Sequence, residues 1–373
     1  MGVIKMEKAK VYYTDMHTTF KENLLQKIQR LVKAAGIETI DFDKKYVAIK
    51  IHFGEPGNLA YLRPNYAKAV IDVIKDLGGK PFLTDCNTLY VGRRKNALDH
   101  LDAAYENGYS PFSTGCHVII ADGIKGTDEA YVPVPDGEYV KEAKIGRAIM
   151  DADIIISLNH FKGHEATGFG GAIKNIGMGC GSRAGKMEMH NAGKPFVKEN
   201  KCIGCGSCIK NCAHSAITIT DKKASIDTDK CLGCGRCVGV CPVDAIKTLN
   251  DESNDILNCK MAEYTAAVIR NRPHFHISLV IDVSPYCDCH AENDLPIVPD
   301  VGMFASFDPV ALDKACADAV NNQPITPGSR LAISEHIHGD HFCDNHPETN
   351  WKSQLTHAEK LGLGTQEYEL IKI

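Results

Sequence analysis

The sequence predicts an α/β protein whose core is a mainly parallel β-sheet. Through the first 158 residues, short apolar stretches typical of strands alternate with amphipathic stretches typical of helices. The alternation resumes after residue 254, beyond a cysteine-rich segment that interrupts it. Strands and helices alternate in this way in layered folds with a parallel sheet. We therefore expect an α/β lobe at residues 1–193, an inserted domain at residues 194–248, and an α/β continuation or second lobe at residues 249–373.

In the first lobe, the expected strands are residues 10–14, 46–52, 80–85, 116–122 and 153–158. The expected helices are residues 20–35, 64–77, 94–107 and 141–151. The first helix carries its apolar residues on one face and ends before Gly36. The second opens with Pro64 and closes at Gly78 and Gly79, which are favourable start and stop signals.

In the second lobe, a helix is expected at residues 255–270, strands at 274–283 and 301–305, and a helix at 309–320. A final helix is expected at residues 353–361. Strands and helices again alternate, so this segment continues the α/β pattern.

Composition excludes several classes of partner. With 373 residues, 44% hydrophobic and 24% charged, the chain is long enough for two or three soluble domains. A net charge of −5 without a basic stripe argues against nucleic acid, and no apolar run of membrane-spanning length occurs. The sixteen cysteines need a reducing compartment to stay thiols, so we expect an anaerobe's cytoplasm.

The cysteine-rich segment contains the run C-x2-C-x2-C-x3-C twice, 29 residues apart. This repeat resembles bacterial two-cluster ferredoxins, in which the fourth cysteine of each run ligates the other run's cluster. The resemblance implies two [4Fe–4S] clusters. One would take Cys202, Cys205, Cys208 and Cys241, and the other Cys231, Cys234, Cys237 and Cys212. Zinc ribbons use two cysteine pairs rather than four cysteines in each run, and disulfide frameworks belong to short secreted chains.

The charge of this segment favours a fixed relay over a diffusing carrier. Between residues 198 and 247 we count eight basic and five acidic side chains, which gives 8 − 5 = +3. Free bacterial ferredoxins are usually acidic, so this module resembles an internal relay.

Polar residues follow several of the predicted strands directly. In parallel sheets, ligands bind beyond the carboxyl ends of the strands. The candidates are His52 and Glu55, Asp85 and Asn87, and Asn159 and His160. A structural role such as helix capping is the alternative for each of them.

A glycine-rich segment at residues 160–185 follows the fifth strand. One interpretation is a cofactor-binding or anion-binding loop at a helix N-terminus. In it, Gly168, Gly170, Gly171 and Lys162 bind the ligand, a carboxylate or phosphate, helped by Lys174. The other is a tight turn shaped by Gly168, Gly170 and Gly171, with Lys174 solvated. The loop does not match G-x-x-x-x-G-K-[ST], so nucleotide hydrolysis is not expected.

This segment also carries two resemblances that cover much of the chain. The stretch from His164 to Lys174, with the later Cys-Asp-Cys, resembles the uncharacterised Fe–S-centre protein family labelled domain of unknown function 362. More distantly, His164, Lys174 and His190 stand at intervals similar to those of nickel-pincer lactate racemases. The first resemblance implies a shared pocket without an established reaction. The second implies a similar fold and pocket location, and a lysine that carries a pincer cofactor.

The run Cys287-Asp-Cys289-His290 is a further candidate site. Two cysteines beside a histidine can bind a soft metal, and Cys180 could join them. Asp288 between the cysteines predicts an exposed loop, while core thiols without function are the alternative. Near the end of the chain, His336, His338 and His341 are expected to form a polar loop.

Taken together, these patterns predict an iron–sulfur redox protein of anaerobic metabolism. Electrons from a donor such as a ferredoxin or flavodoxin would pass through the clusters and reduce a small anionic substrate in the α/β pocket. His52, His164 or His190 would supply protons and Lys174 would hold the anion. A further metal or organic cofactor in the pocket remains open, as do a non-catalytic electron carrier and a pincer-type racemase or epimerase.

Overall fold

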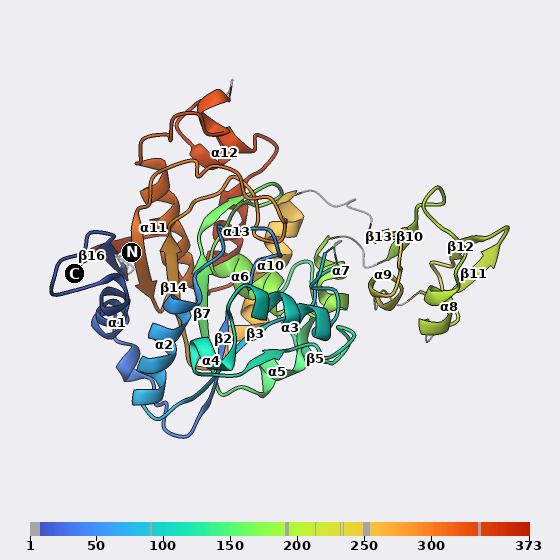
Figure 1. Cartoon of the computed structure of the whole chain (residues 1–373), viewed down its shortest axis with the longest axis horizontal. Helices are drawn as coiled ribbons and strands as arrows, with labels where there is room; N and C mark the ends of the chain where they lie inside the picture. Colours follow the sequence, from blue (N-terminus) through green and yellow to red (C-terminus); the bar gives the residue numbers. More distant parts are fainter. Residues whose placement is uncertain are drawn as a thin grey trace, which may run out of the picture.

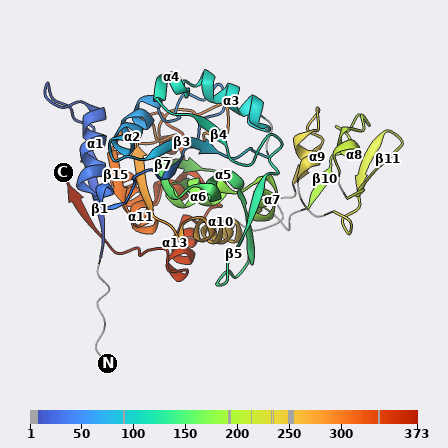
Figure 2. The ribbon, with the colours of Figure 1, turned by 90° about the horizontal axis from the view of Figure 1, so that it is seen from below.

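The computed structural model describes residues 8–89, 92–190, 194–212, 214–231, 233, 235–248, 254–334 and 337–373. Its centre is one eight-stranded sheet with helices on both faces (Figures 1 and 2). This arrangement confirms the predicted α/β class. Among the described residues, no helix is both long and apolar enough to cross a bilayer.

The sheet has the strand order β16-β1-β15-β14-β7-β2-β3-β4. Its strands are β1 (Ala9–Asp15), β2 (Tyr46–Lys50), β3 (Lys80–Asp85), β4 (Val118–Ile120), β7 (Ile154–His160), β14 (His274–Val280), β15 (Gly302–Ser306) and β16 (Tyr368–Lys372). All neighbouring pairs are parallel except those that β15 makes with β1 and β14. Segments before and after the cysteine-rich insert therefore contribute strands to the same sheet.

Two layers of helices cover this sheet (Figure 2). One face carries α1 (Leu24–Ala34), α2 (Pro64–Asp76), α3 (Ala97–Glu106) and α4 (Pro111–Thr114). The other carries α6 (Ala172–Cys180), α10 (Asn254–Ile269), α11 (Pro309–Asn321) and α13 (Trp351–Lys360). Apolar side chains fill both interfaces, because the parallel strands are buried on both faces and use apolar residues throughout.

Shorter elements complete the main body. They are the hairpins β5 (Glu129–Pro133) with β6 (Glu142–Gly146) and β8 (Lys162–His164) with β9 (Gly168–Gly170), the helices α5 (Arg147–Asp151), α7 (Arg183–His190) and α12 (His341–Asn345), and the 3₁₀ turns η1 (Ile37–Thr39) and η2 (Leu331–Ile333).

Several element boundaries follow from local caps. Asn23 begins α1 because its side chain accepts hydrogen bonds from the backbone amides of Leu25 and Gln26, and the Gln26 side chain bonds back to the Asn23 amide. Gly36 follows α1 in the left-handed conformation at φ 88°. The expected helix at residues 20–35 therefore starts four residues later than its apolar face suggests.

The prediction of one helix over residues 141–151 is wrong in its first half. Glu142–Gly146 instead forms β6, which pairs antiparallel with β5, and only Arg147–Asp151 is helical. The burial of β6 explains this, because Ala143 and Ile145 are buried while Glu142 is exposed, which is the period of a strand.

The insert extends from one side of the main body (Figure 1). It contains β10 (Pro195–Val197) paired with β13 (Ile246–Thr248), β11 (Ile217–Thr220) paired with β12 (Lys223–Ile226), and the short helices α8 (Ser207–Asn211) and α9 (Arg236–Gly239). The pairing of β10 with β13 brings the two ends of the insert together. The predicted domain boundaries at 193/194 and 248/249 stay a prediction.

Candidate functional site

A cavity of about 230 Å³ lies beyond the carboxyl ends of β2, β3 and β7. Residues widely separated in the sequence meet here because parallel strands end at a common edge of the sheet. The cavity lining includes nearly all of the pocket residues expected from the sequence, namely His52, His164, Lys174, His190, Lys162, Gly170, Gly171, Cys287 and Cys289.

Lys174 and Cys287 form the polar centre of this pocket. The ammonium nitrogen of Lys174 lies 3.5 Å from the Sγ atom of Cys287. A hydrogen bond from Cys289, opposed by burial and reinforced by the charge of Lys174, holds the pKa of Cys287 well below its usual value. Burial alone would lower the pKa of Lys174, but Cys287, Cys289 and Glu165 outweigh it and raise that pKa. The pair therefore favours a thiolate beside an ammonium.

The loop that carries Cys287 is buried, which corrects the expectation of an exposed loop. Asp288 has no exposed surface and Cys287 is 1% exposed. One carboxylate oxygen of Asp288 lies 2.8 Å from Nδ1 of His160, while its backbone carbonyl accepts a hydrogen bond from the amide of Glu55. The Asp288 side chain can therefore point into the protein, because its carboxylate pairs with the ring of His160.

The pocket histidines differ in their capacity to carry a proton. Burial and then the charge of Arg94 lower the pKa of His52 well below its usual value, and Arg94 lies 2.9 Å from its Nε2 atom. Burial and the neighbouring His164 lower the pKa of His190 to about 3. Neither ring is an imidazolium at neutral pH, so the structure does not favour these two as proton donors. His164 accepts two backbone amides at Nδ1, which leaves Nε2 facing Glu165 at 3.8 Å.

Positive charge predominates around the cavity. The charged side chains of its lining are the cations Lys50, Arg94, Lys162, Lys174 and Lys186, and the carboxylates Asp85 and Glu165. Lys50 pairs with Asp85 at 3.1 Å, and Arg94 with the buried Glu55 at 2.9 Å. The excess of cations suits an anionic ligand.

The glycine-rich loop supports the pocket without presenting a free helix terminus. The carboxylate of Asp313 accepts hydrogen bonds from the backbone amides of Ala172 and Ile173, at 2.7 and 2.9 Å. Burial raises the pKa of Asp313 to about 7. Because these two amides begin α6 and are already engaged by Asp313, they are not free to bind an anion. Anion binding by the rest of the glycine-rich loop stays a prediction.

Gly168 lies away from the cavity lining. It adopts a left-handed φ of 78°, and a Cβ atom placed on it would lie 2.8 Å from the Cβ atom of Trp351. This glycine therefore permits close packing of β9 against α13, which is the tight-turn interpretation rather than the cofactor-binding one.

Two other candidates lie outside the pocket. Cys180 is buried in a hydrophobic cluster of α6 and α10 and is not part of the cavity lining, so it does not join Cys287 and Cys289. In the histidine-rich tail, His341 bonds through Nε2 to the backbone carbonyl of Gln323. His336 lies outside the described residues.

In the insert, the cysteines of the two runs gather in the exchanged pattern. One small cavity is lined by Cys202, Cys205, Cys208 and Cys241, and a second by Cys212, Cys231 and Cys237. Cys234 lies outside the described residues. Both cavities therefore combine cysteines of one run with the fourth cysteine of the other.

The local backbone suits thiolate donors at these positions. The amides of Ala224 and Ala245 donate to the sulfurs of Cys202 and Cys241, and that of Ala216 donates to Cys212, at 3.2 to 3.4 Å. Such hydrogen bonds stabilise thiolate charge. In each run, the glycines between the first three cysteines adopt left-handed conformations, with φ from 68° to 77°. The donor set thus fits the two four-iron clusters that the repeat implies.

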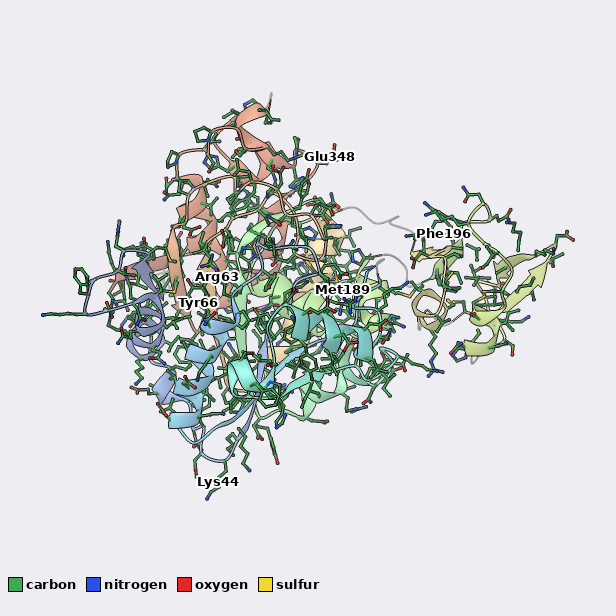
Figure 3. The ribbon with its side chains drawn as sticks, in the orientation of Figure 1. Lys44, Arg63, Tyr66, Met189, Phe196 and Glu348 are labelled. Carbon is green, nitrogen blue, oxygen red and sulfur yellow. The ribbon has the colours of Figure 1, made fainter. Side chains whose placement is uncertain are left out.

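Helix α7 forms the wall between the insert and the pocket. Lys186 and His190 of this helix line the pocket, while Met187 joins the hydrophobic cluster of the insert with Cys237 and Val238. A Cβ atom on Gly235 would lie 2.8 Å from the sulfur of Met187. Figure 3 labels Met189 of α7 in the main body and Phe196 of β10 in the insert. The second cysteine run therefore lies one helix away from the pocket.

Sequence reasoning missed several pocket residues. Lys50, Arg94 and Lys186 were not among its candidates, and neither was Glu165, which lies 2.9 Å from His290. The one indication of Glu165 in the sequence is that it directly follows the candidate His164. The lysines and the arginine carry no distinctive spacing, because their partners are far away in the sequence.

Comparison with known proteins places the chain in a family. Residues 47–318 match the family described as Domain of unknown function (DUF362). The chain is 28% identical over 125 residues to the thylakoid-associated protein sll1697 of Synechocystis sp., which covers 34% of this chain and 35% of that protein. The match thus spans about a third of the relative's length.

Two solved structures resemble this chain at low similarity. The lactate racemase apoprotein of Thermoanaerobacterium thermosaccharolyticum is 12% identical with a TM-score of 0.37, covering 74% of this chain and 51% of its own. A Thermotoga maritima protein is 14% identical with a TM-score of 0.37, covering 76% and 55%. The family match covers well over half of the chain, and the chain therefore belongs to the DUF362 family.

Proposed function

We propose that this protein is an iron–sulfur oxidoreductase that reduces a small anionic substrate in the pocket of the main body. Two [4Fe–4S] clusters held by the insert would supply one-electron transfer at low potential. The observation that carries the proposal is the position of α7, which contacts the second cysteine run through Met187 and the pocket through Lys186 and His190.

The two cysteine runs have different surroundings, and this difference suggests the direction in which electrons pass through the insert. The first run faces solvent, because Cys205 is exposed and a Cβ atom on Gly206 would meet nothing within 4 Å. The second run packs on α7, where Gly235 and Gly239 approach Arg183. A redox donor such as a ferredoxin or flavodoxin would therefore dock at the first run, and its electrons would leave from the second.

Within the pocket, Lys162 and Lys174 bind and orient the anion. Both ammonium groups line the cavity, and a charge-assisted hydrogen bond from each fixes one oxygen of the substrate. His164, next to Glu165, donates a hydrogen bond to the anion, since its Nδ1 accepts backbone amides and its Nε2 carries the hydrogen, and the protons consumed by the reduction come from solvent water.

The test uses anaerobically purified protein whose clusters have been reduced with dithionite and freed of excess reductant. Candidate carboxylates and phosphate esters are added while visible absorbance of the clusters is followed. Reoxidation by one class of anion, with a reduced product found by mass spectrometry, supports the proposal. Stable reduced clusters with every anion favour the electron carrier. Isomerisation of an anion with no change in cluster absorbance favours a racemase or epimerase.

A further inference from the structure

A second candidate centre lies at the rim of the pocket, outside the cysteine runs. Glu165, Cys289 and His290 place one carboxylate oxygen, one sulfur and one ring nitrogen within 4.8 Å of one another. The closest pair is Nε2 of His290 and Oε1 of Glu165, at 2.9 Å. Glu165 comes from the turn between β8 and β9, and the other two follow β14.

The surrounding backbone holds these side chains in place. The amide of His290 donates to the carbonyl of Cys287, at 3.1 Å, and the side-chain amide of Asn58 donates to the carbonyl of His290, also at 3.1 Å. Asp288, between the two cysteines, is anchored by His160 at 2.8 Å. Cys289 and His290 therefore lie on a loop fixed from both sides, and Glu165 reaches them from the turn between β8 and β9.

Their chemistry indicates the kind of ion. A thiolate, an imidazole and a carboxylate are the ligands of borderline divalent metals such as Zn²⁺ or Fe²⁺, whereas Mg²⁺ and Ca²⁺ take oxygen ligands. Cys287 is placed differently, because its sulfur lies 3.5 Å from the ammonium of Lys174. Of the two cysteines that the sequence suggested, Cys289 thus belongs to the triad.

We propose that Glu165, Cys289 and His290 bind one divalent transition-metal ion of the zinc or ferrous class. Three protein ligands leave a coordination position open for water or an exchangeable ligand. Glu165, Cys289 and His290 all line the pocket that contains Lys162 and Lys174. An oxygen atom of an anionic substrate therefore occupies the open position while the lysines hold the rest of its charge. Binding of the metal itself does not depend on the redox function proposed above, whereas this role for the substrate rests on it.

Equilibrium dialysis against radioactive zinc tests the site in the complete protein, purified anaerobically with its clusters in place. The ligand variants are Cys289→Ser, His290→Asn and Glu165→Gln. The matched control is Cys343→Ser, a half-buried cysteine on α12 that is not part of the pocket lining. We expect one zinc per chain in wild type and control, and affinity lower by about 10-fold or more in Cys289→Ser and His290→Asn.

Iron is measured in every sample, so that loss of zinc from this site is distinguished from damage to the insert. Unchanged zinc affinity in both Cys289→Ser and His290→Asn, with iron content unchanged, overturns the site. Equal loss in the control overturns it as well, since the effect is then not local. A third outcome is that the ligand variants lose zinc affinity, the control keeps it, and no anion oxidises the reduced clusters. That outcome supports the metal site and refutes the redox function.

Discussion

At the scale of single residues, the pocket sets a cationic lining beside the sulfur of Cys287. Lys174 is central because its ammonium group contacts Cys287 and faces the cavity in which an anion would bind. Asp85 already pairs with Lys50, and Glu55 already pairs with Arg94. Lys162 lies 3.9 Å from Asp288, a longer contact than either of these, so Lys174 and Lys162 are the cations best placed to bind a ligand's charge.

Lys174→Ala should weaken binding of the anionic substrate by about 1.5–3 kcal/mol, because it removes a charge-assisted hydrogen bond from an enclosed site. Cluster content should not change, since the substitution touches none of the insert cysteines. The measurement is anaerobic calorimetry with the anion that reoxidises the clusters. Lys68→Ala is the control, because Lys68 pairs with Asp72 on the exposed side of α2. Equal affinities in Lys174→Ala and Lys68→Ala would remove Lys174 from the site.

At the scale of elements, α6 depends on a residue far away in the sequence. Asp313, on α11, accepts the two amides that begin α6, and this helix carries Lys174 into the pocket. Asp313→Ala leaves both buried donors without that acceptor, and should lower the free energy of unfolding by about 1–3 kcal/mol. Chemical denaturation checks this, with Asp72→Ala, at a half-buried position on α2, as control. A loss no greater than that of Asp72→Ala would show that the cap contributes little.

The contact between α13 and α10 predicts a pH dependence. Hydrogen bonds with Cys259 and then Glu263 raise the pKa of His357 to about 9, and its Nε2 lies 2.9 Å from Glu263. A raised pKa means that the protonated ring stabilises the folded state below about pH 6.5, and that this contribution is lost as pH rises through about 9. After allowance for solvent screening we expect a loss of about 1–2 kcal/mol.

Chemical denaturation gives the free energy of unfolding of wild type and His357→Gln at pH 6.5 and at pH 9. The loss between the two pH values in wild type, minus the loss in His357→Gln, is the contribution of His357. The subtraction cancels the effect of other groups that titrate in the same range. His117→Gln, at an exposed position, is the control. If His357→Gln loses as much stability as wild type over this range, the His357 pair is not its source.

Much of the main body could be predicted from the sequence because its signals are local. The strands β1, β2, β3 and β7 each appear as short apolar runs, and the helices show caps, proline starts or glycine stops. The error at β6 arose because a five-residue strand next to a helix resembles one amphipathic helix until its partner β5 is known. The short β16 was missed for the same reason, since its partner β1 lies at the other end of the chain.

The candidate site was predictable only in part. Residues that follow parallel strands, such as His52 and His160, could be expected near one another because the fold class brings strand ends together. The burial of Asp288 and the capping of α6 by Asp313 could not be expected, since each depends on a contact between distant segments. Glu165 likewise becomes a candidate ligand only in the folded chain, where the turn after β8 lies beside His290.

At the scale of the whole molecule, the insert and the main body meet at α7, and the two cysteine runs should therefore differ in function. Cys208→Ser should damage chiefly the cluster shared with Cys241, and Cys237→Ser the one shared with Cys212. Dithionite is small and needs no docking surface, so it can reduce the remaining cluster of Cys208→Ser directly, and this variant should still reduce the substrate. Cys237 packs with Val238 and Met187, on the side of the insert that faces α7, so Cys237→Ser should lose substrate reduction even with dithionite.

Electron paramagnetic resonance of the reduced variants identifies which cluster is lost, and product formation reports the pathway. Substrate reduction that survives in Cys237→Ser and fails in Cys208→Ser would reverse the proposed direction. Equal loss in both, with one cluster retained in each, would show that both are required even for a small reductant.

The central claim is that the insert holds two four-iron clusters, and metal analysis after anaerobic purification tests it most directly. Iron and acid-labile sulfide are measured per chain on protein that has been purified and handled without exposure to oxygen. The account predicts about eight of each, because the eight cysteines of the two runs form two ligand sets of four. Four irons per chain, or zinc in stoichiometric amount in place of iron at the cysteine runs, would contradict it.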